Sequence, residues 1–290
     1  MHTKKKRLFA TALLFPALII HMFVIFIPSL SSLYYSMTGW TGINTPTFVA
    51  FKNYIEAFTD KDLLSAFLHN LIWLLLALTI PIIIGLLVAL LVKRIKKLQM
   101  FFRTAFFMPY VLSSVVVGQI FSIYYNPFGG INSLFDKLGL TTLSNINWLG
   151  KGMALVSVFI ADTWHWWGFI MVIMLSALHQ VDESLYEACK IDGGNSIQRF
   201  FHITIPQIMP TLVTIITLIT IWSFVTYDYI WVMTSGGPAG ATEVISTYVY
   251  TTTFVKYRAG YSSAINVLTT LLCVFIYIIL RKFILKKVEE

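Results

Sequence analysis

Long apolar stretches separated by short polar segments set the organisation of the chain. The hydrocarbon core of a bilayer is about 30 Å thick, so a helix that crosses it needs roughly 20 apolar residues. Six stretches reach this length, and they lie at about 8–36, 67–92, 104–125, 153–178, 210–234 and 262–285. Pro81 lies inside the second stretch, where we expect it to kink the helix. The pattern predicts an all-α polytopic membrane protein with six transmembrane helices.

The first stretch follows four basic residues, 4–7, in the order that secretory signal peptides show. Its apolar run is too long for the central region of a signal peptide, and no small-residue cleavage site follows it. We therefore expect an uncleaved first transmembrane helix.

Composition agrees with a membrane protein. The chain is 57% hydrophobic and 12% charged, whereas soluble domains carry about 25% charged residues. Cys189 lies in a polar segment and Cys273 in an apolar one, far apart in the sequence. We expect neither a disulfide framework nor a thiolate metal site.

The net charge of +8 is unevenly distributed along the chain. If the N-terminus is inside the cell, fifteen Lys and Arg residues fall on inner segments and six on outer loops. Because inner loops of membrane proteins are enriched in Lys and Arg, this split predicts that both termini and the segment 179–209 are cytoplasmic. The basic charge is thus a topology signal in a multi-pass membrane protein, and it gives no support to nucleic-acid binding.

The polar segment 179–209 predicts two short helices. Residues 186–192 continue a helix, which Gly193 and Gly194 end. Asn195 or Ser196 then caps a second helix with an apolar side. On pattern alone, this helix either lies on the lipid surface as a connector or inserts into the groove of a partner.

The same segment carries a motif of fixed spacing, EAC-x3-G-x9-I-x-IP, formed by Glu187, Ala188, Cys189, Gly193, Ile203, Ile205 and Pro206. It resembles the EAA loop of ABC importer permeases, whose pattern is EAA-x3-G-x9-I-x-LP. The two departures, Cys189 and Ile205, nearly preserve size and apolarity. Residues 48–58 and 235–254 resemble segments of the MalF-like permeases of carbohydrate importers. The chain is therefore similar to this subfamily over most of its length.

The resemblance implies a type I importer permease fold, with one transmembrane domain over 1–290. It implies an extracellular or periplasmic solute-binding protein, a second permease subunit and two cytoplasmic ABC ATPases as partners. It assigns coupling to the ATPases to Glu187, Ala188, Gly193, Ile203 and Pro206. Glu187 would pair with a basic group of an ATPase and Gly193 would permit the turn, although Glu187 as a plain solvated charge stays an alternative.

The sequence holds no G-x-x-x-x-G-K-[ST] loop to cradle phosphates. We expect a transport subunit that is not an enzyme and binds neither a metal nor a cofactor, with ATP and Mg on the partner ATPases.

The fourth stretch has an unusual centre at residues 162–167. Tryptophans normally mark the bilayer interfaces, and a carboxylate at this depth costs roughly 2.5–3.5 kcal/mol, so it should face a cavity or a partner. Asp162, His165 and Trp166 share one helix face, and Trp164 lies on a neighbouring face. Aromatic faces with a few polar groups suit a sugar.

The resemblance also aligns Trp164 with a tryptophan of the span that carries the sugar contacts in the maltose permease. His165 and Trp166 fall on contact positions there but differ in residue type. The substrate-binding candidates are Asp162, Trp164, His165, Trp166, Ser223 and Tyr227. A structural alternative is that Asp162 and His165 pair and staple helices together.

Three functions follow. The first is the permease subunit of an ATP-driven, binding-protein-dependent importer for a sugar or oligosaccharide, which works by alternating access. The second is an ABC permease for another solute, such as an amino acid or a metal oxyanion, since the EAA loop is shared across those families. The third is a proton-coupled carrier that uses Asp162 and His165.

Overall fold

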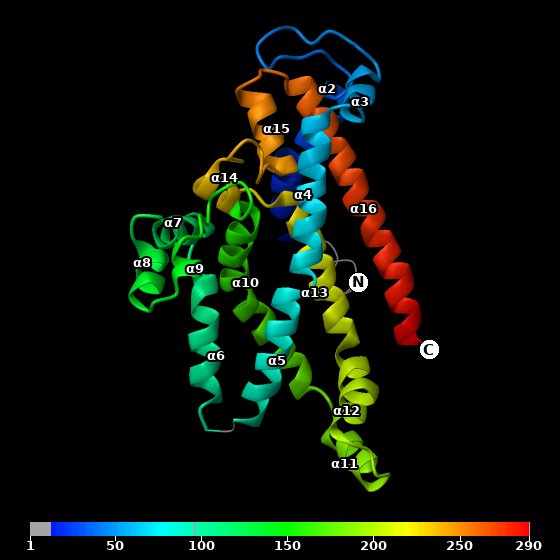
Figure 1. The fold of residues 1–290 in the computed structure, drawn as a ribbon. Helices are drawn as coiled ribbons and strands as arrows, with labels where there is room; N and C mark the ends of the chain where they lie inside the picture. The colour runs from blue at the N-terminus through cyan, green and yellow to red at the C-terminus, as the bar shows by residue number, and fades with distance from the viewer. Residues whose placement is uncertain (1–12, 96, 290) are drawn as a thin grey trace, which may run out of the picture. The chain divides into compact units, whose positions relative to one another are not determined.

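The computed structural model describes residues 13–95 and 97–289 and is helical (Figure 1). Residues 1–12, which carry the start of the first predicted span and four of the counted charges, lie outside the described residues, as does Lys96. Within the described ranges, the only β-structure is an isolated bridge between Thr38 and Phe48. The helices are α2 (Ile27–Tyr35), α3 (Lys52–Ala57), α4 (Lys61–Ala77), α5 (Ile80–Arg94), α6 (Gln99–Phe107), α7 (Ser114–Tyr124), α8 (Gly130–Lys137), α9 (Thr141–Ser144), α10 (Ala154–His179), α11 (Glu183–Ile191), α12 (Ser196–Arg199), α13 (Ile205–Val225), α14 (Asp228–Thr234), α15 (Ile245–Phe254) and α16 (Ala259–Glu289).

Five helical segments of the described chain are long and apolar enough to cross a membrane. They are Leu13–Tyr35, Lys61–Arg94, Ala154–His179, Ser196–Val225 and Ala259–Ile279. A sixth span results if the bent pair Gln99–Val111 and Ser114–Tyr124 counts as one. The prediction of an all-α, multi-pass membrane protein is confirmed.

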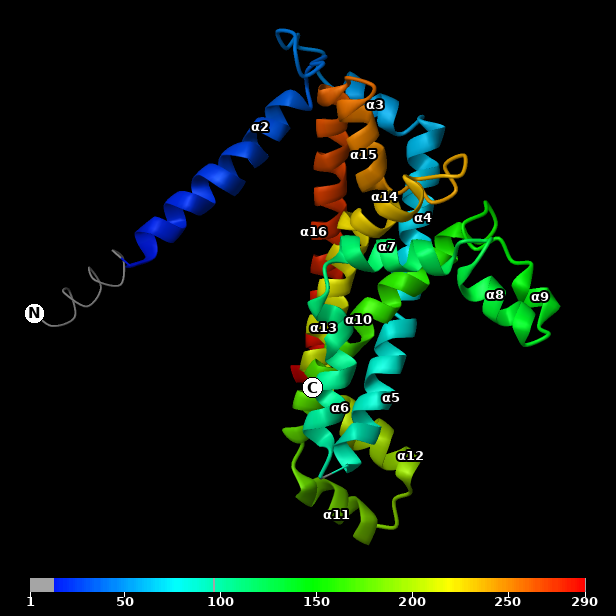
Figure 2. The same ribbon diagram turned by 90° about the vertical axis from the view of Figure 1, so that its left-hand side faces the viewer.

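The predicted third span, 104–125, differs from a straight helix. Helix α6 ends at Phe107 and is followed by a tight turn, Met108–Val111, before α7 begins at Ser114. The two parts meet at an angle of 90°, and Figure 2 shows α7 lying across the direction of α6. Pro109 lies in the turn and lacks a backbone N–H, so it cannot continue the hydrogen bonding of a regular helix.

The second and fifth spans also differ in detail from the prediction. The second contains a break between Ala77 and Ile80, just before Pro81, where the kink was predicted. The fifth helix ends at Val225 rather than at 234, because Thr226 leaves the helical conformation with ψ 126°. The residues that follow form the separate helix α14. The segment 179–209 contains the two predicted short helices and runs directly into α13.

The chain divides into two compact units, one formed by 1–60 and 249–271, the other by 61–248 and 272–290. In the first unit, the Asn53 side-chain amide donates to the backbone oxygens of Ser36 and Thr38, both at 2.9 Å. Arg258 pairs with Glu56 at 2.7 Å. These contacts fix α3, which lies within the segment 48–58, against the start of α16.

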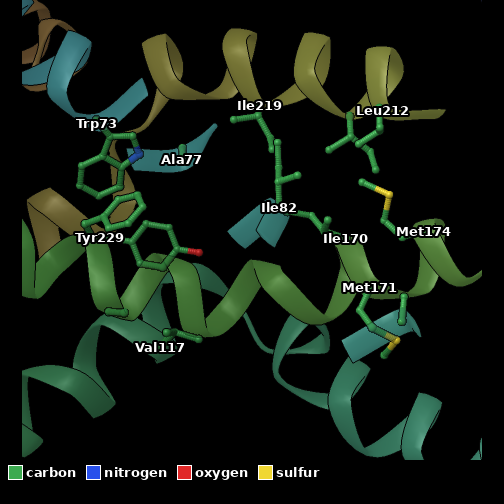
Figure 3. Packing of buried hydrophobic residues seen from close by; sticks show 14 of the residues in the cluster. Trp73, Ala77, Ile82, Val117, Ile170, Met171, Met174, Leu212, Ile219 and Tyr229 are labelled. Atoms are coloured by element: carbon green, nitrogen blue, oxygen red, sulfur yellow. The ribbon is translucent and has the colours of Figure 1, made fainter. Parts of the chain in front are cut away.

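The core of the second unit forms around α10, which packs against α5, α6, α7, α13 and α14. Figure 3 shows Ile170 of α10, Ile82 of α5 and Ile219 of α13 meeting between the helices. The approach of α10 to α6 is close at Gly168, where an added Cβ atom would lie 1.8 Å from the carbonyl oxygen of Phe106. Helix α10 is therefore the element that positions the site described below.

Candidate functional site

Helices α11 and α12 form an exposed pair at one end of the second unit, and α7 and α14 lie toward the other end (Figures 1 and 2). Helix α11 begins at a defined cap, because Asp182 accepts a hydrogen bond of 2.9 Å from the backbone N–H of Ser184. The same hydrogen bond holds the pKa of Asp182 below its usual value. The carboxylate therefore caps the helix in its charged form.

Two glycines make the turn between α11 and α12. Gly193 has φ +80°, a conformation that side chains with a Cβ atom rarely adopt. A Cβ atom on Gly194 would lie 2.4 Å from the sulfur of Cys189. Asn195 then caps α12 in a reciprocal arrangement with Gln198, at 2.8 and 2.9 Å. The predicted order of helix, glycine stop, asparagine cap and helix is confirmed.

The helix pair is anchored to the helices behind it. The Tyr186 hydroxyl hydrogen-bonds the Thr204 hydroxyl at 2.9 Å, which connects α11 to the start of α13. Lys93, at the end of α5, donates to the backbone oxygen of Leu178 at 2.7 Å and lies over the ring of Tyr186. A force applied to α11 is thus transmitted to α5, α10 and α13.

The predicted coupling residues occupy two environments. Glu187, Ala188, Gly193 and Pro206 are exposed, whereas Ile203 is half-buried and packs against the core. Four large apolar side chains of the same segment are also exposed, namely Leu185, Ile191, Ile197 and Phe201. The α11–α12 pair therefore presents a mixed apolar and charged surface. Ile203 packs against the core behind this surface.

A cavity of about 620 Å³ lies in the second unit. Its walls come from α4, α5, α10, α13, α14, the turn after α6 and the start of α7. The lining residues are Trp73, Ala77, Pro81, Tyr110, Ser114, Asp162, His165, Trp166, Ile170, Ile219, Trp222, Ser223, Val225, Thr226, Tyr227, Asp228 and Tyr229. Five of the six substrate-binding candidates are among them, brought together from α10 and the end of α13.

The carboxylates of the cavity differ in their partners. Asp228 accepts a short hydrogen bond from the hydroxyl of Ser114. Within the described ranges, no hydrogen bond or ion pair joins Asp162 to another side chain or to the backbone. No Lys or Arg is found among the lining residues. The cavity therefore holds a carboxylate without a protein partner.

His165 is engaged at both ring nitrogens. Nε2 lies 3.0 Å from the carbonyl oxygen of Leu112, which can only accept, so Nε2 carries the proton. Nδ1 lies 2.5 Å from the Tyr229 hydroxyl and accepts from it when the ring is neutral. The suggested staple between Asp162 and His165 is wrong: His165 instead joins α10 to the end of the turn after α6 and to α14.

Aromatic rings form much of the remaining wall. Trp166 and Trp222 have ring centroids 4.2 Å apart, and Tyr110 lies 5.1 Å from Trp166. Trp164, grouped with these residues from the sequence, does not line the cavity. It is 38% exposed and packs edge-on against Phe121, because it lies about 160° around the helix from Asp162 and about 100° from His165.

Several lining residues were not candidates from the sequence, namely Trp73, Tyr110, Ser114, Trp222, Asp228 and Tyr229. Pro109 was the available signal for a turn that presents Tyr110 and Ser114. Among the described residues, no group of three or more His, Cys, Asp or Glu side chains is placed to hold a metal ion.

The model of the family described as "Binding-protein-dependent transport system inner membrane component" matches residues 81–290. The probable ABC transporter permease protein YurN of Bacillus subtilis is 32% identical over 282 residues, which cover 96% of each chain. The chain belongs to this family of ABC transporter permeases.

Other similarities extend over nearly the whole permease. The trehalose/maltose transport system permease protein MalF of Thermococcus litoralis is 28% identical over 276 residues, 93% of this chain and 91% of that one. The fold is similar to a bacterial ABC transporter chain "involved in the import of the acidic polysaccharide alginate", with a TM-score of 0.83 and 20% identity over 97% and 96% of the two chains.

Family membership gives the permease its place in a transporter. It is a multi-pass membrane component of a system that works with a binding protein, and it is a transport subunit rather than an enzyme. The exposed pair α11–α12 carries the motif typical of the family.

Proposed function

We propose that this permease forms part of the translocation pathway of an ATP-driven importer for a sugar or oligosaccharide. The observation that carries the proposal is that one unit contains both the exposed motif helices and an aromatic, polar cavity. Helices α10 and α13 connect them. A movement imposed at α11 and α12 can therefore change the shape of the cavity.

Coupling would act through the surface of the α11–α12 pair. Exposed apolar side chains at a helix terminus fit a groove on a partner, and Glu187 supplies a charge for a basic group within it. The hydrogen bond from Tyr186 to Thr204 and the lysine at the end of α5 tie the pair to the bundle. Closure of the ATPases would then rock these helices between inward- and outward-facing states.

The sugar assignment rests on the cavity and on the names of relatives. Tryptophan and tyrosine faces suit the C–H faces of a pyranose, and carboxylates accept hydrogen bonds from its hydroxyls. Relatives include a probable starch degradation products permease of Thermoanaerobacterium thermosulfurigenes, 28% identical over 269 residues that cover 91% of this chain and 89% of that one. The substrate-binding residues are Asp162, Trp166, Ser223 and Tyr227. His165 positions the cavity wall through its hydrogen bonds to Tyr229 and Leu112.

The transporter would further contain a second permease subunit, two cytoplasmic ABC ATPases that bind ATP and Mg, and an external solute-binding protein. The charge distribution supports cytoplasmic termini and a cytoplasmic α11–α12 pair in a bacterial-type cell membrane.

The proton-carrier alternative fits the geometry less well. Both nitrogens of His165 are occupied by Tyr229 and Leu112, and neither contacts Asp162. Uptake by the reconstituted permease alone, driven by a proton gradient and independent of ATP, would establish that alternative and exclude the importer.

The coupling assignment is tested with Glu187→Gln in the assembled transporter. Loss of a charge-assisted contact with the ATPase should lower ATP-driven uptake about tenfold. Glu183→Gln is the matched control, because it removes an exposed charge from the first turn of the same helix and should leave uptake within about twofold of the wild type. Equal uptake by both variants would remove Glu187 from the coupling surface.

A further inference from the structure

The charge of the cavity bears on which sugars it accepts. Asp162 and Asp228 both line it, no Lys or Arg does, and the proton on Nε2 of a neutral His165 is directed at the backbone oxygen of Leu112. The carboxyl groups of the wall accept hydrogen bonds, and no side chain of the wall carries a positive charge that would offset them.

From this we infer that the cavity admits saccharides that are neutral or carry a protonated amine and rejects saccharides that carry a carboxylate. The inference rests on the proposed sugar-permease function and deepens it. A hydroxyl or ammonium group would donate to Asp162, the carboxylate that lacks a protein partner. A uronic acid would bring its carboxylate close to Asp162 and Asp228, and repulsion between like charges disfavours its binding.

The aromatic wall supports the same selection. The faces of Trp166 and Trp222 accept the C–H faces of a neutral sugar, and their electron-rich rings attract a cation and repel an anion. The second carboxylate, Asp228, is held at the wall by the hydroxyl of Ser114, so its charge cannot easily turn away. The chain of similar fold named for alginate import handles an acidic polysaccharide. An acidic saccharide would be complemented by basic side chains, whereas this cavity is lined by two carboxyl groups and by no Lys or Arg.

The test uses the purified full-length permease in lipid nanodiscs at neutral pH. The probes are glucose disaccharides with α-1,4 and β-1,4 linkages, with their 2-amino and uronic acid counterparts. Binding is followed by tryptophan fluorescence, and the Trp73→Phe, Trp166→Phe and Trp222→Phe variants together show which part of the signal comes from the cavity. We expect a neutral or amino disaccharide to bind and its uronic acid counterpart to bind at least about tenfold more weakly.

The variants isolate the role of the carboxylate. Asp162→Asn should reduce the discrimination against the uronic acid to about threefold or less, and Asp162→Glu, which keeps the charge, should retain it. Asp136→Asn removes an exposed carboxylate on α8 and should change nothing.

The outcomes separate the inference from the proposed function. A uronic acid that binds the wild type as tightly as its neutral counterpart, or an Asp162→Asn variant with unchanged discrimination, overturns the inference and leaves the sugar permease standing. If no disaccharide of the panel quenches the cavity signal, the sugar assignment itself fails, and the inference with it.

Discussion

At the scale of single residues, His165 shows how one side chain fixes the geometry of the cavity. It lies on α10, and its two nitrogens reach the carbonyl oxygen of Leu112, directly after the turn that follows α6, and the tyrosine of α14. The side chains of His165 and Tyr229 are both buried, so neither can exchange a lost bond for bulk water. The imidazole therefore connects α10 to the turn after α6 and to α14.

We expect His165→Phe to lower the free energy of unfolding by about 2–4 kcal/mol, since it leaves the Tyr229 hydroxyl and the Leu112 carbonyl without their partner. Thermal unfolding of the purified permease in detergent measures the loss. His165→Gln should recover part of it, because an amide can donate to one group and accept from the other. A phenylalanine variant as stable as the wild type would show that the two bonds contribute little.

Trp166 and Trp164 form a second test at this scale. Trp166 packs against Trp222 in the cavity wall with the two rings tilted, whereas Trp164 lies outside the cavity against Phe121. Trp166→Ala should weaken disaccharide binding in nanodiscs at least about tenfold, and Trp164→Ala should leave it within about threefold. The reverse order of effects would restore the role that the sequence suggested for Trp164.

At the scale of elements, the close approach of α10 and α6 determines where the cavity lies. Because Gly168 has no side chain, α10 packs directly against the backbone at Phe106, three residues before Pro109. The chain turns by 90° just beyond this contact, and the turn presents Tyr110 and Ser114 to the cavity. Gly168 in α10 and Pro109 in the turn after α6 thus together shape one wall of the cavity.

Gly168→Ala should destabilise the permease by about 1–3 kcal/mol or more, because the added methyl group meets a backbone oxygen that no side-chain rotation can move. The measurement is the midpoint of thermal unfolding, followed by size-exclusion chromatography. Gly152→Ala is the matched control, since a Cβ atom there meets nothing within 4 Å. Equal midpoints for the two variants would mean that the helices separate at little cost.

At the scale of the whole molecule, the orientation in the membrane determines which end of the second unit is available to the proposed ATPases. The Lys and Arg distribution predicts that α11 and α12 lie inside the cell and the segment between α7 and α8 outside. Both regions have well-exposed side chains, with Ile191 86% and Phe128 98% exposed. This pair of sites allows the orientation to be measured directly.

In a background with Cys189→Ser and Cys273→Ser, a membrane-impermeant maleimide should label the Ile191→Cys variant only in inside-out vesicles. It should label the Phe128→Cys variant only in intact or right-side-out preparations. Since both side chains are exposed, a difference in labelling reports the side of the membrane and not burial. Labelling of both variants from the same side would contradict the predicted topology.

The sequence by itself determined the class of the fold, the position of the motif helices and the family. These features depend on local signals: apolar length relative to bilayer thickness, glycine and asparagine at a helix end, and fixed motif spacing. The structure confirmed the turn at Gly193 and the cap at Asn195 because both are set by the conformation of a few neighbouring residues.

Only the tertiary structure decided which side chains form the cavity. Helical periodicity grouped Asp162, His165 and Trp166 correctly, but it could not pair His165 with Tyr229, 64 residues away. Tyr110, Trp222 and Asp228 join the wall because α6 and α13 end, and α14 begins, beside α10. A site assembled from the ends of several helices has no local pattern, since its geometry is set by contacts between residues far apart in the chain.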